Sequence, residues 1–115
     1  MNYSFKKHDW DGTTVYGVES SDKKILSNFG SWGWTPVKIQ NIINGVEASK
    51  IKAYGKEYNW SSEELELYAN KKGVLLIDMM AQRAGQKDPS SSTLKLSHNE
   101  ILKFLNDFKI FVENN

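Results

Sequence analysis

KIKAYGKEYNWSSEELELYANKKGVLLIDMM, residues 50–80, decides the fold of this 115-residue chain. Apolar and polar side chains alternate in residues 58–60 and again in residues 65–69, which is the period-two pattern of strands with one buried face. The polar residues 61–64 suit a hairpin loop, and residues 70–73 supply Asn and Gly, which tolerate a positive φ. The stretch therefore predicts three or four antiparallel strands joined by tight turns.

The end of this stretch allows two interpretations. Residues 74–77 are a continuous apolar run, which periodicity alone cannot assign to a buried strand or a buried helix. The turn before the run favours a strand, whereas residues 76–84, LIDMMAQRA, are compatible with a helix that begins near Asp78. The sequence therefore does not decide whether residues 74–84 form a strand or a helix.

The N-terminal third predicts a second meander. Residues 3–10 form an edge strand, and the dipeptide Asp11-Gly12 is a strong hairpin-turn signal. Residues 13–19 are rich in β-branched and aromatic side chains, and residues 25–29 form a third strand after a polar turn. We therefore expect three strands before the first helix.

Two helices with capping signals complete the pattern. Thr35 is an N-cap residue type, and residues 36–49 after it begin with proline and carry an apolar stripe. Ser97 and Glu100 have the spacing of a capping box, which opens a second helix over residues 101–112. We expect both helices to cover the central sheet.

The segment between the central strands and the last helix completes the topology. Residues 82–92 contain one proline and three consecutive serines, which predict an exposed, mobile loop, and residues 93–96 form a last short strand. The element order is then β-β-β-α-β-β-β-(β)-α. This order predicts an α+β fold, an antiparallel β-meander sheet covered by two helices, in a single domain of residues 1–115.

Composition and charge exclude several classes of protein. The chain has no cysteine, which removes disulfides, thiolate chemistry and cysteine-based zinc sites. It has no apolar run long enough for a secretory signal or a membrane span, so we expect a cytoplasmic protein without membrane contact. The net charge of +1 argues against a dedicated nucleic-acid binder, whose basic surface usually shows in the total.

No catalytic motif is present in the sequence. There is no P-loop, no dinucleotide-binding glycine motif after a strand and no nucleophile elbow. His98 lies in the capping box, where a solvated side chain is expected. His8 with Asp9 and Asp11 could hold a divalent cation, but a hairpin rim is the simpler interpretation. We therefore expect a protein that is not an enzyme and that binds no metal and no cofactor.

Acidic residues crowd the central hairpin. Glu63, Glu64 and Glu66 form either a solvated face or an acidic docking surface for a basic partner such as a nuclease active site. Asp9 and Asp11 lie on the hairpin of the N-terminal third. Together they define the acidic part of a candidate surface that would steer a basic protein partner.

Two tryptophans supply the aromatic part. Trp32 and Trp34 flank Gly33, so their side chains point the same way if the backbone is extended. They are either core residues beneath the first helix or hot spots of an interface, where Trp is enriched. The candidate partner-binding residues are Asp9, Asp11, Trp32, Trp34, Glu63, Glu64 and Glu66.

A run of lysines interleaved with aromatic residues is a further candidate. Such a pattern could clamp and stack on single-stranded RNA. The residues are Lys50, Lys52, Lys56, Tyr54, Tyr58 and Trp60. The glutamates that adjoin this run would repel the RNA backbone, which argues against direct nucleic-acid binding.

Residues 44–112 resemble a known family. The segment AYGKEY at residues 53–58, the alternating strand of residues 64–70, LKL at residues 94–96 and the aromatic C-terminal helix are similar to the small bacterial YacL-like proteins. The resemblance implies, as the alternative function, a housekeeping protein that binds RNA or a ribosome-associated partner.

A compact, cysteine-free chain without catalytic motifs also resembles the immunity proteins of contact-dependent growth inhibition and related polymorphic toxin systems. This resemblance implies that the chain binds the C-terminal domain of a cognate toxin, often a nuclease that cleaves tRNA, and occludes its active site or substrate surface. We take toxin neutralisation as the leading functional hypothesis. The sequence fixes neither the toxin nor the oligomeric state.

Overall fold

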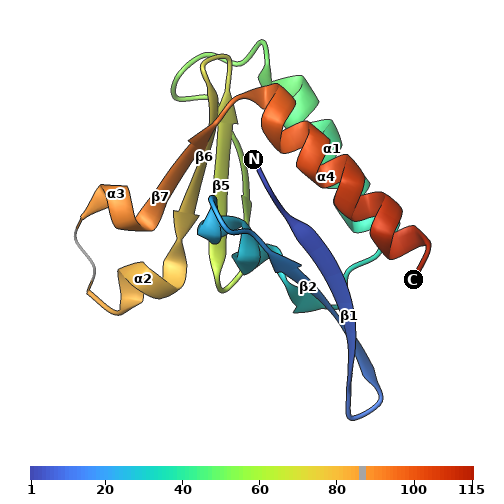
Figure 1. The fold of residues 1–115 in the computed structure, drawn as a ribbon. Coiled ribbons are helices and arrows are strands. Elements are labelled where there is room, and N and C mark those ends of the chain that lie inside the picture. Colours follow the sequence, from blue (N-terminus) through green and yellow to red (C-terminus); the bar gives the residue numbers. More distant parts are fainter. Residues whose placement is uncertain (86–87) are drawn as a thin grey trace.

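The computed structural model describes residues 1–85 and 88–115, which form an α+β fold with two antiparallel sheets (Figure 1). The three-stranded sheet has the order β1 (Ser4–Trp10), β2 (Thr13–Glu19), β3 (Ser31–Trp32). The four-stranded sheet has the order β4 (Tyr58–Ser61), β5 (Leu65–Asn70), β6 (Gly73–Asp78), β7 (Thr93–Leu96). The predicted α+β class and the central antiparallel meander are thus confirmed, and the first strands form a sheet of their own.

Two long helices lie side by side against the four-stranded sheet (Figure 1). They are α1 (Pro36–Ser49) and α4 (His98–Glu113). Three shorter helices lie between strands: the 3-10 helix η1 (Lys24–Phe29), α2 (Met79–Arg83) and α3 (Pro89–Ser92). The three-stranded sheet packs against α4 from another side, where Phe5 of β1 contacts the rings of Phe104, Phe108 and Phe111.

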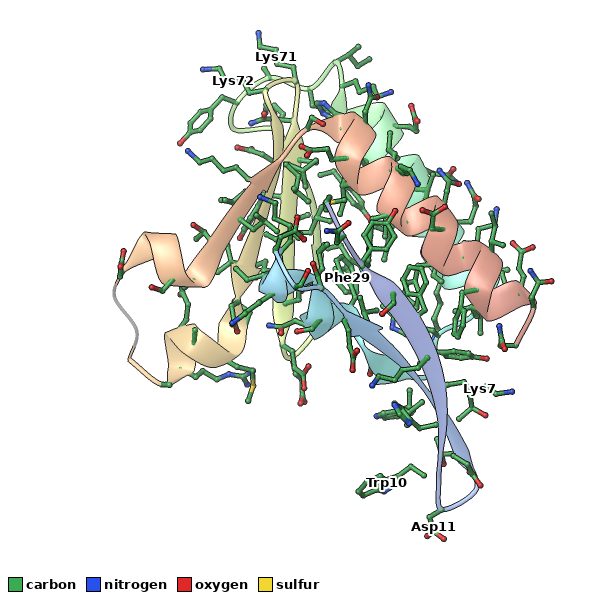
Figure 2. The ribbon with its side chains drawn as sticks, in the orientation of Figure 1. Lys7, Trp10, Asp11, Phe29, Lys71 and Lys72 are labelled. Carbon is green, nitrogen blue, oxygen red and sulfur yellow. The ribbon has the colours of Figure 1, made fainter. Side chains whose placement is uncertain are left out.

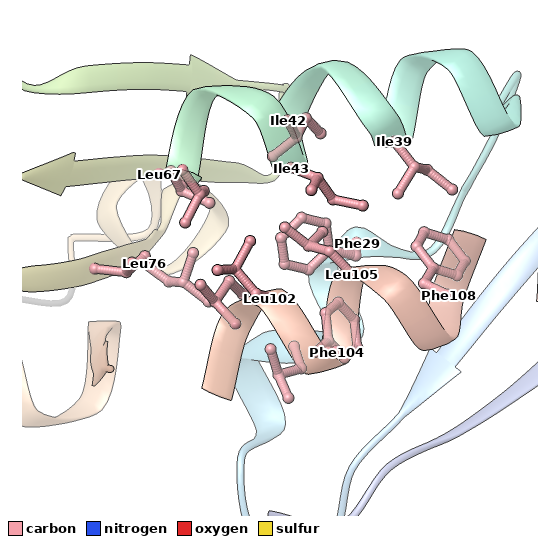
Figure 3. Packing of buried hydrophobic residues seen from close by; sticks show 14 of the residues in the cluster. Phe29, Ile39, Ile42, Ile43, Leu67, Leu76, Leu102, Phe104, Leu105 and Phe108 are labelled. Atoms are coloured by element: carbon pink, nitrogen blue, oxygen red, sulfur yellow. The ribbon is translucent and has the colours of Figure 1, made fainter. Parts of the chain in front are cut away.

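One hydrophobic cluster connects both sheets and both long helices. Figure 3 shows its centre, where isoleucines of α1 face Leu105 of α4 and the ring of Phe29 lies between the two helices. The largest fully buried side chains come from η1, α1, α4 and the two central strands β5 and β6: Phe29, Phe104, Phe108, Leu26, Ile39, Ile42, Leu65, Leu67, Leu76, Ile101, Leu105 and Val46. The core therefore holds the relative position of the two sheets.

The predicted helix signals are confirmed. Thr35 accepts a hydrogen bond from the backbone amide of Lys38, and α1 has the predicted bounds. Ser97 and Glu100 form the reciprocal capping box of α4. Residues 74–84, which the sequence left open between strand and helix, contain both. The strand β6 ends at Asp78, whose carboxylate accepts hydrogen bonds from the first backbone amides of α2.

Residues 25–29 are not a strand, so this prediction is wrong. They belong to η1, in which Leu26 and Phe29 are the buried side chains. A separation of three residues puts both on one side of a 3-10 helix, whereas in a strand they would point to opposite faces. Ser27 adds a hydrogen bond from its hydroxyl to the Lys24 carbonyl, which supports the tight turn.

The prediction of an exposed loop over residues 82–92 is wrong at both ends as to secondary structure, whereas residues 82–85, 88 and 91 are exposed as predicted. The helix α2 continues to Arg83, and α3 occupies residues 89–92 and ends in the buried side chain of Ser92. Ser92 donates to the Asp88 carbonyl, which satisfies its hydroxyl inside the fold. Residues 86–87 of this predicted loop lie outside the described residues.

Candidate partner-binding site

A groove of about 350 Å³ lies where the two sheets approach each other. Its walls come from the edge strands β3 and β4, and the first turns of α1 close one side. Its lining combines five aromatic rings with amides, hydroxyls, one isoleucine and one lysine: Asn28, Phe29, Ser31, Trp32, Gly33, Trp34, Lys38, Asn41, Ile42, Tyr58, Trp60 and Ser62. This volume is at the small end of ligand sites, and it suits one or two side chains of a partner.

The floor of this aromatic groove is a stack of rings. The ring centroids of Trp34 and Trp60 are 5.8 Å apart, and those of Trp60 and Phe29 are 5.6 Å apart. The indole Nε1 of Trp34 donates a 2.7 Å hydrogen bond to the Phe29 carbonyl. Packing and a hydrogen bond both hold Trp34, so the floor is anchored on the core.

Trp32 forms the rim and is 71% exposed. Gly33 has a φ of +81°, so the strand ends there and the two tryptophans do not share a direction. The Lys38 ammonium donates to the Gly33 carbonyl at 2.9 Å and holds this turn against α1. The core interpretation therefore holds for Trp34, whereas Trp32 stands in solvent.

Glu63 and Glu64 lie beside the groove in the β4–β5 loop. Ser62 lines the groove, and Asn28, which also lines it, donates a 3.0 Å hydrogen bond to the Glu64 carbonyl. Both glutamates are exposed, and within the described residues neither carboxylate forms an ion pair. The guanidinium of Arg83 donates to the Glu63 carbonyl, which fixes the loop and places one positive charge beside it.

Glu66 lies apart from these two residues, on the face of the four-stranded sheet that points away from the core. It is paired with Ser61 of β4 and Ile77 of β6. A hydrogen bond with Glu66 raises the pKa of the neighbouring Tyr68 hydroxyl. The structure thus brings Glu63, Glu64 and the tryptophans to one groove and leaves Glu66 on a different surface.

The strand register extends the aromatic surface from the groove to the tip of the β1–β2 hairpin. Val15 of β2 lies opposite Trp32 on one side and His8 on the other, and Trp10 lies opposite Thr13. Directly opposite residues point to the same face of a sheet. This exposed aromatic face carries Trp10, which is 76% exposed, and Trp32, while the other face of the sheet packs on the core.

Asp11 is at the hairpin tip (Figure 2), and Asp9 lies in β1 opposite Thr14, just before the turn. Asp11 and Gly12 both have positive φ, +52° and +86°, as a type I′ turn requires. The Asp9 carboxylate accepts a 2.9 Å hydrogen bond from the Gly12 amide, so it stabilises the turn. Asp11 and Trp10 are left at the end of a hairpin that projects from the body of the molecule.

Neither histidine supports a metal site. The residues that the structure describes contain no cluster of three or more His, Asp or Glu side chains that could hold a metal ion. His98 is half-buried and its Nε2 lies 2.7 Å from the Asn70 carbonyl, so the expectation of a solvated side chain is wrong. His98 instead joins the start of α4 to the β5–β6 turn.

The predicted RNA clamp is not assembled as one surface. Tyr58 and Trp60 point to the core side of β4, and burial raises the pKa of Tyr58. Tyr54, in contrast, is 82% exposed, and Lys50 forms an ion pair with Glu47. Period-two alternation explains the separation, since every second residue of β4 faces inward.

No protein-family model, curated protein or solved structure matches this chain. None of the helices in the described residues is long and apolar enough to cross a lipid bilayer. Function is therefore inferred from the exposed aromatic and charged groups described above.

Two features of the site were missed at the sequence level. Trp10 was assigned to an edge strand with no functional role, because a strand pattern does not tell which sheet face remains uncovered. The groove itself depends on the approach of β3 and β4, which are separated by the whole of α1. A turn signal next to an aromatic residue, as in Trp10-Asp11-Gly12, is the signal that could have identified the tip.

Proposed function

We propose that this protein is a binding module that inhibits a basic protein partner, and that the partner is a toxin domain of the contact-dependent or polymorphic type. The observation that carries the proposal is the exposure of Trp10 and Trp32 on one face of the three-stranded sheet. The resemblance to immunity proteins in size and in the lack of catalytic motifs supports the choice of partner class.

The energetic reason is the size of the exposed rings. Covering one indole removes on the order of 150 Å² from water, which corresponds to about 4 kcal/mol at roughly 25 cal/mol per Å² before the costs of association. Two such rings, held by a rigid sheet, are typical of interface hot spots. Among the residues that the structure describes, no ring contact involves Trp10 or Trp32, whereas Trp34 and Trp60 stack on each other.

The charge beside the aromatic groove indicates the chemistry of the partner. Glu63 and Glu64 at the groove and Asp11 at the tip are exposed carboxylates on the margins of the aromatic face. Such an arrangement attracts lysine and arginine side chains and accelerates encounter. A nuclease domain exposes these side chains around its substrate, so the proposed inhibitor would occlude that surface.

Co-expression tests the proposal directly. The chain is expressed with the C-terminal domain encoded by the gene immediately upstream, and growth and complex formation by size exclusion are scored. Rescue of growth with a one-to-one complex is the expected result. Growth arrest without a complex would show that this domain is not the partner and would overturn the proposed inhibition.

Point variants then locate the interface. Trp32→Ala should lower the affinity of the complex by roughly 30- to 150-fold, as expected for a hot spot of about 2–3 kcal/mol, without lowering the thermal midpoint. Tyr54→Ala is the matched control, because it removes an equally exposed ring from a loop outside the aromatic groove. Equal affinities of the two variants in a calorimetric titration would exclude the aromatic face.

A further inference from the structure

Five lysines that come from separate parts of the sequence lie at one end of the molecule. The α1–β4 loop contributes Lys52 and Lys56, the β5–β6 turn contributes Lys71 and Lys72, and β7 contributes Lys95. Within the described residues none of these five lysines forms an ion pair. The chain carries a net charge of only +1, so this lysine end is balanced by acidic groups elsewhere and is not visible in the composition.

The backbone of the lysine end is fixed by hydrogen bonds. The Lys71 amide donates to the Lys52 carbonyl at 2.8 Å, which joins the loop to the turn. The Asn70 carboxamide accepts from the Lys72 amide at 2.8 Å, and the Asn70 carbonyl is 2.7 Å from His98 Nε2. The backbone that carries these lysines is therefore held in place, and Figure 2 shows the side chains of Lys71 and Lys72 extending from it.

A shallow pocket of about 450 Å³ adjoins these lysines. Its rim carries Lys72, Lys95 and two tyrosines, Tyr54 and Tyr68. Tyr54 is 82% exposed and no ring lies against it in the described part of the chain. An exposed ring between unpaired ammonium groups is the arrangement that stacks on a base while the charges hold the phosphates.

Two carboxylates, Glu57 and Glu66, lie near this pocket and oppose the lysine charges. Glu57 lines the pocket, and hydrogen bonds from its own amide and from the Gly55 amide hold its pKa below the usual value. The Glu57 carboxylate thus forms hydrogen bonds with the loop backbone and with the Asn70 side chain. Glu66 is bonded to Tyr68. The balance at this end of the molecule therefore remains positive.

We propose that the lysine end, with Tyr54 and Tyr68, is a binding site for single-stranded RNA. The site is independent of the proposed toxin partner, because Trp32 and the Glu63–Glu64 loop belong to the groove between the sheets. RNA is favoured over an anionic membrane because the pocket combines the rings of Tyr54 and Tyr68 with ammonium groups, which suits stacked bases and phosphates.

The test uses the full chain and a fluorescein-labelled oligouridylate of roughly 12 nucleotides, with affinity measured by anisotropy. We expect the logarithm of the association constant to fall with the logarithm of salt concentration with a slope of about −2 to −3, as three or four neutralised phosphates require. The double variant Lys71→Glu and Lys72→Glu should weaken binding at least about tenfold. The charge-matched control, Lys7→Glu with Lys24→Glu, should bind as the unchanged chain does.

Tyr54→Ala separates a stacking site from general attraction of polyanions. We expect it to weaken oligouridylate binding by about tenfold and to leave heparin binding unchanged. Equal losses in the control pair and the Lys71/Lys72 pair, or an unchanged RNA affinity of Tyr54→Ala, would overturn the proposal. Binding to phosphatidylserine vesicles in preference to the oligonucleotide would overturn it as well.

Discussion

Gly45 lies in the middle of α1, where glycine ordinarily weakens a helix by about 1 kcal/mol relative to alanine. Glycine is required here by a neighbouring strand, because a Cβ at this position would overlap the ring of Tyr58 on β4. The close approach of α1 to β4 therefore depends on the missing side chain. This contact also places one wall of the aromatic groove.

We predict that Gly45→Ala destabilises the protein by about 1–3 kcal/mol, the usual cost of overpacking, although the helix propensity of the new residue is better. Urea denaturation measures the difference. In a Tyr58→Ala background the overlap is absent, so the same substitution should be neutral or should stabilise by up to about 1 kcal/mol. An equal effect in both backgrounds would show that the ring is not the cause.

Side-chain direction at single residues was the least predictable part of the site from sequence. The pair Trp32 and Trp34 depended on the backbone of Gly33, whose positive φ cannot be deduced from a glycine between two tryptophans. His98 was expected in water because it follows an N-cap, yet the Asn70 carbonyl lies within hydrogen-bond distance after folding. Both outcomes required a tertiary neighbour that no local pattern contains.

At the scale of elements, local chemistry was sufficient wherever a cap or a turn was encoded. The helix α1 begins at the residue after Thr35, and α4 begins within its capping box. The β1–β2 hairpin turns at Asp11-Gly12, as its sequence predicts. The sequence did not predict the 3-10 helix η1, because the apolar residues within 25–29 fit either a strand or a helical turn. Burial of Leu26 and Phe29 in the core favours the helical turn.

The capping box gives α4 a measurable dependence on pH. Hydrogen bonds from the Ser97 amide and hydroxyl hold the pKa of Glu100 below its usual value of 4.5. A carboxyl group whose pKa is lowered in the folded state stabilises the protein above its unfolded pKa, and this contribution is lost as the pH falls through the folded value. The loss is therefore expected on acidification below about pH 4.5.

We predict that Glu100→Gln flattens the acid limb of the stability profile, because glutamine can still accept from the Ser97 amide but does not titrate. Chemical denaturation at pH 7, 5, 4 and 3 measures the profile. Ser97→Ala, which removes the N-cap oxygen, should cost about 1 kcal/mol at pH 7. Parallel profiles for Glu100→Gln and the unchanged chain would contradict the assigned role of the carboxylate.

The whole molecule measures 42 × 32 × 23 Å and carries opposite charges at separate places. Successive turns of an antiparallel meander alternate between its ends, so the acidic β4–β5 loop and the basic β5–β6 turn lie at opposite ends of β5. Figure 2 likewise shows Lys71 and Lys72 far from Trp10 and Asp11. The two proposed surfaces are thus separated by the core.

This separation predicts reciprocal behaviour of two variants. Trp32→Ala should lose affinity for the toxin domain and retain oligouridylate binding, whereas Tyr54→Ala should do the opposite. Parallel calorimetric and anisotropy titrations on the same preparations measure both. Loss of both activities in either variant, with an unchanged thermal midpoint, would show that the two surfaces are coupled or that one assignment is wrong.

The fold class and the helix order were predictable because they depend on patterns within single segments. The division into two sheets was not, since it depends on Phe29 and the aromatic residues of α4 filling the space between them. The lysine end was hidden for a related reason. Its charges are separated by more than forty positions from Lys52 to Lys95, and only the completed meander brings them together.

The four tryptophans fall into an exposed pair and a stacked pair, so the intrinsic fluorescence of the protein can report on its surface. Trp34 and Trp60 are stacked at the floor of the groove, whereas Trp10 and Trp32 are open to solvent. Its emission should therefore contain a red-shifted part that iodide quenches strongly and a blue-shifted part, from the half-buried Trp34 and Trp60, that iodide quenches less. Replacing Trp10 and Trp32 by phenylalanine should remove the strongly quenched part, so the emission of the unchanged chain can report a partner that covers the aromatic face without any attached dye.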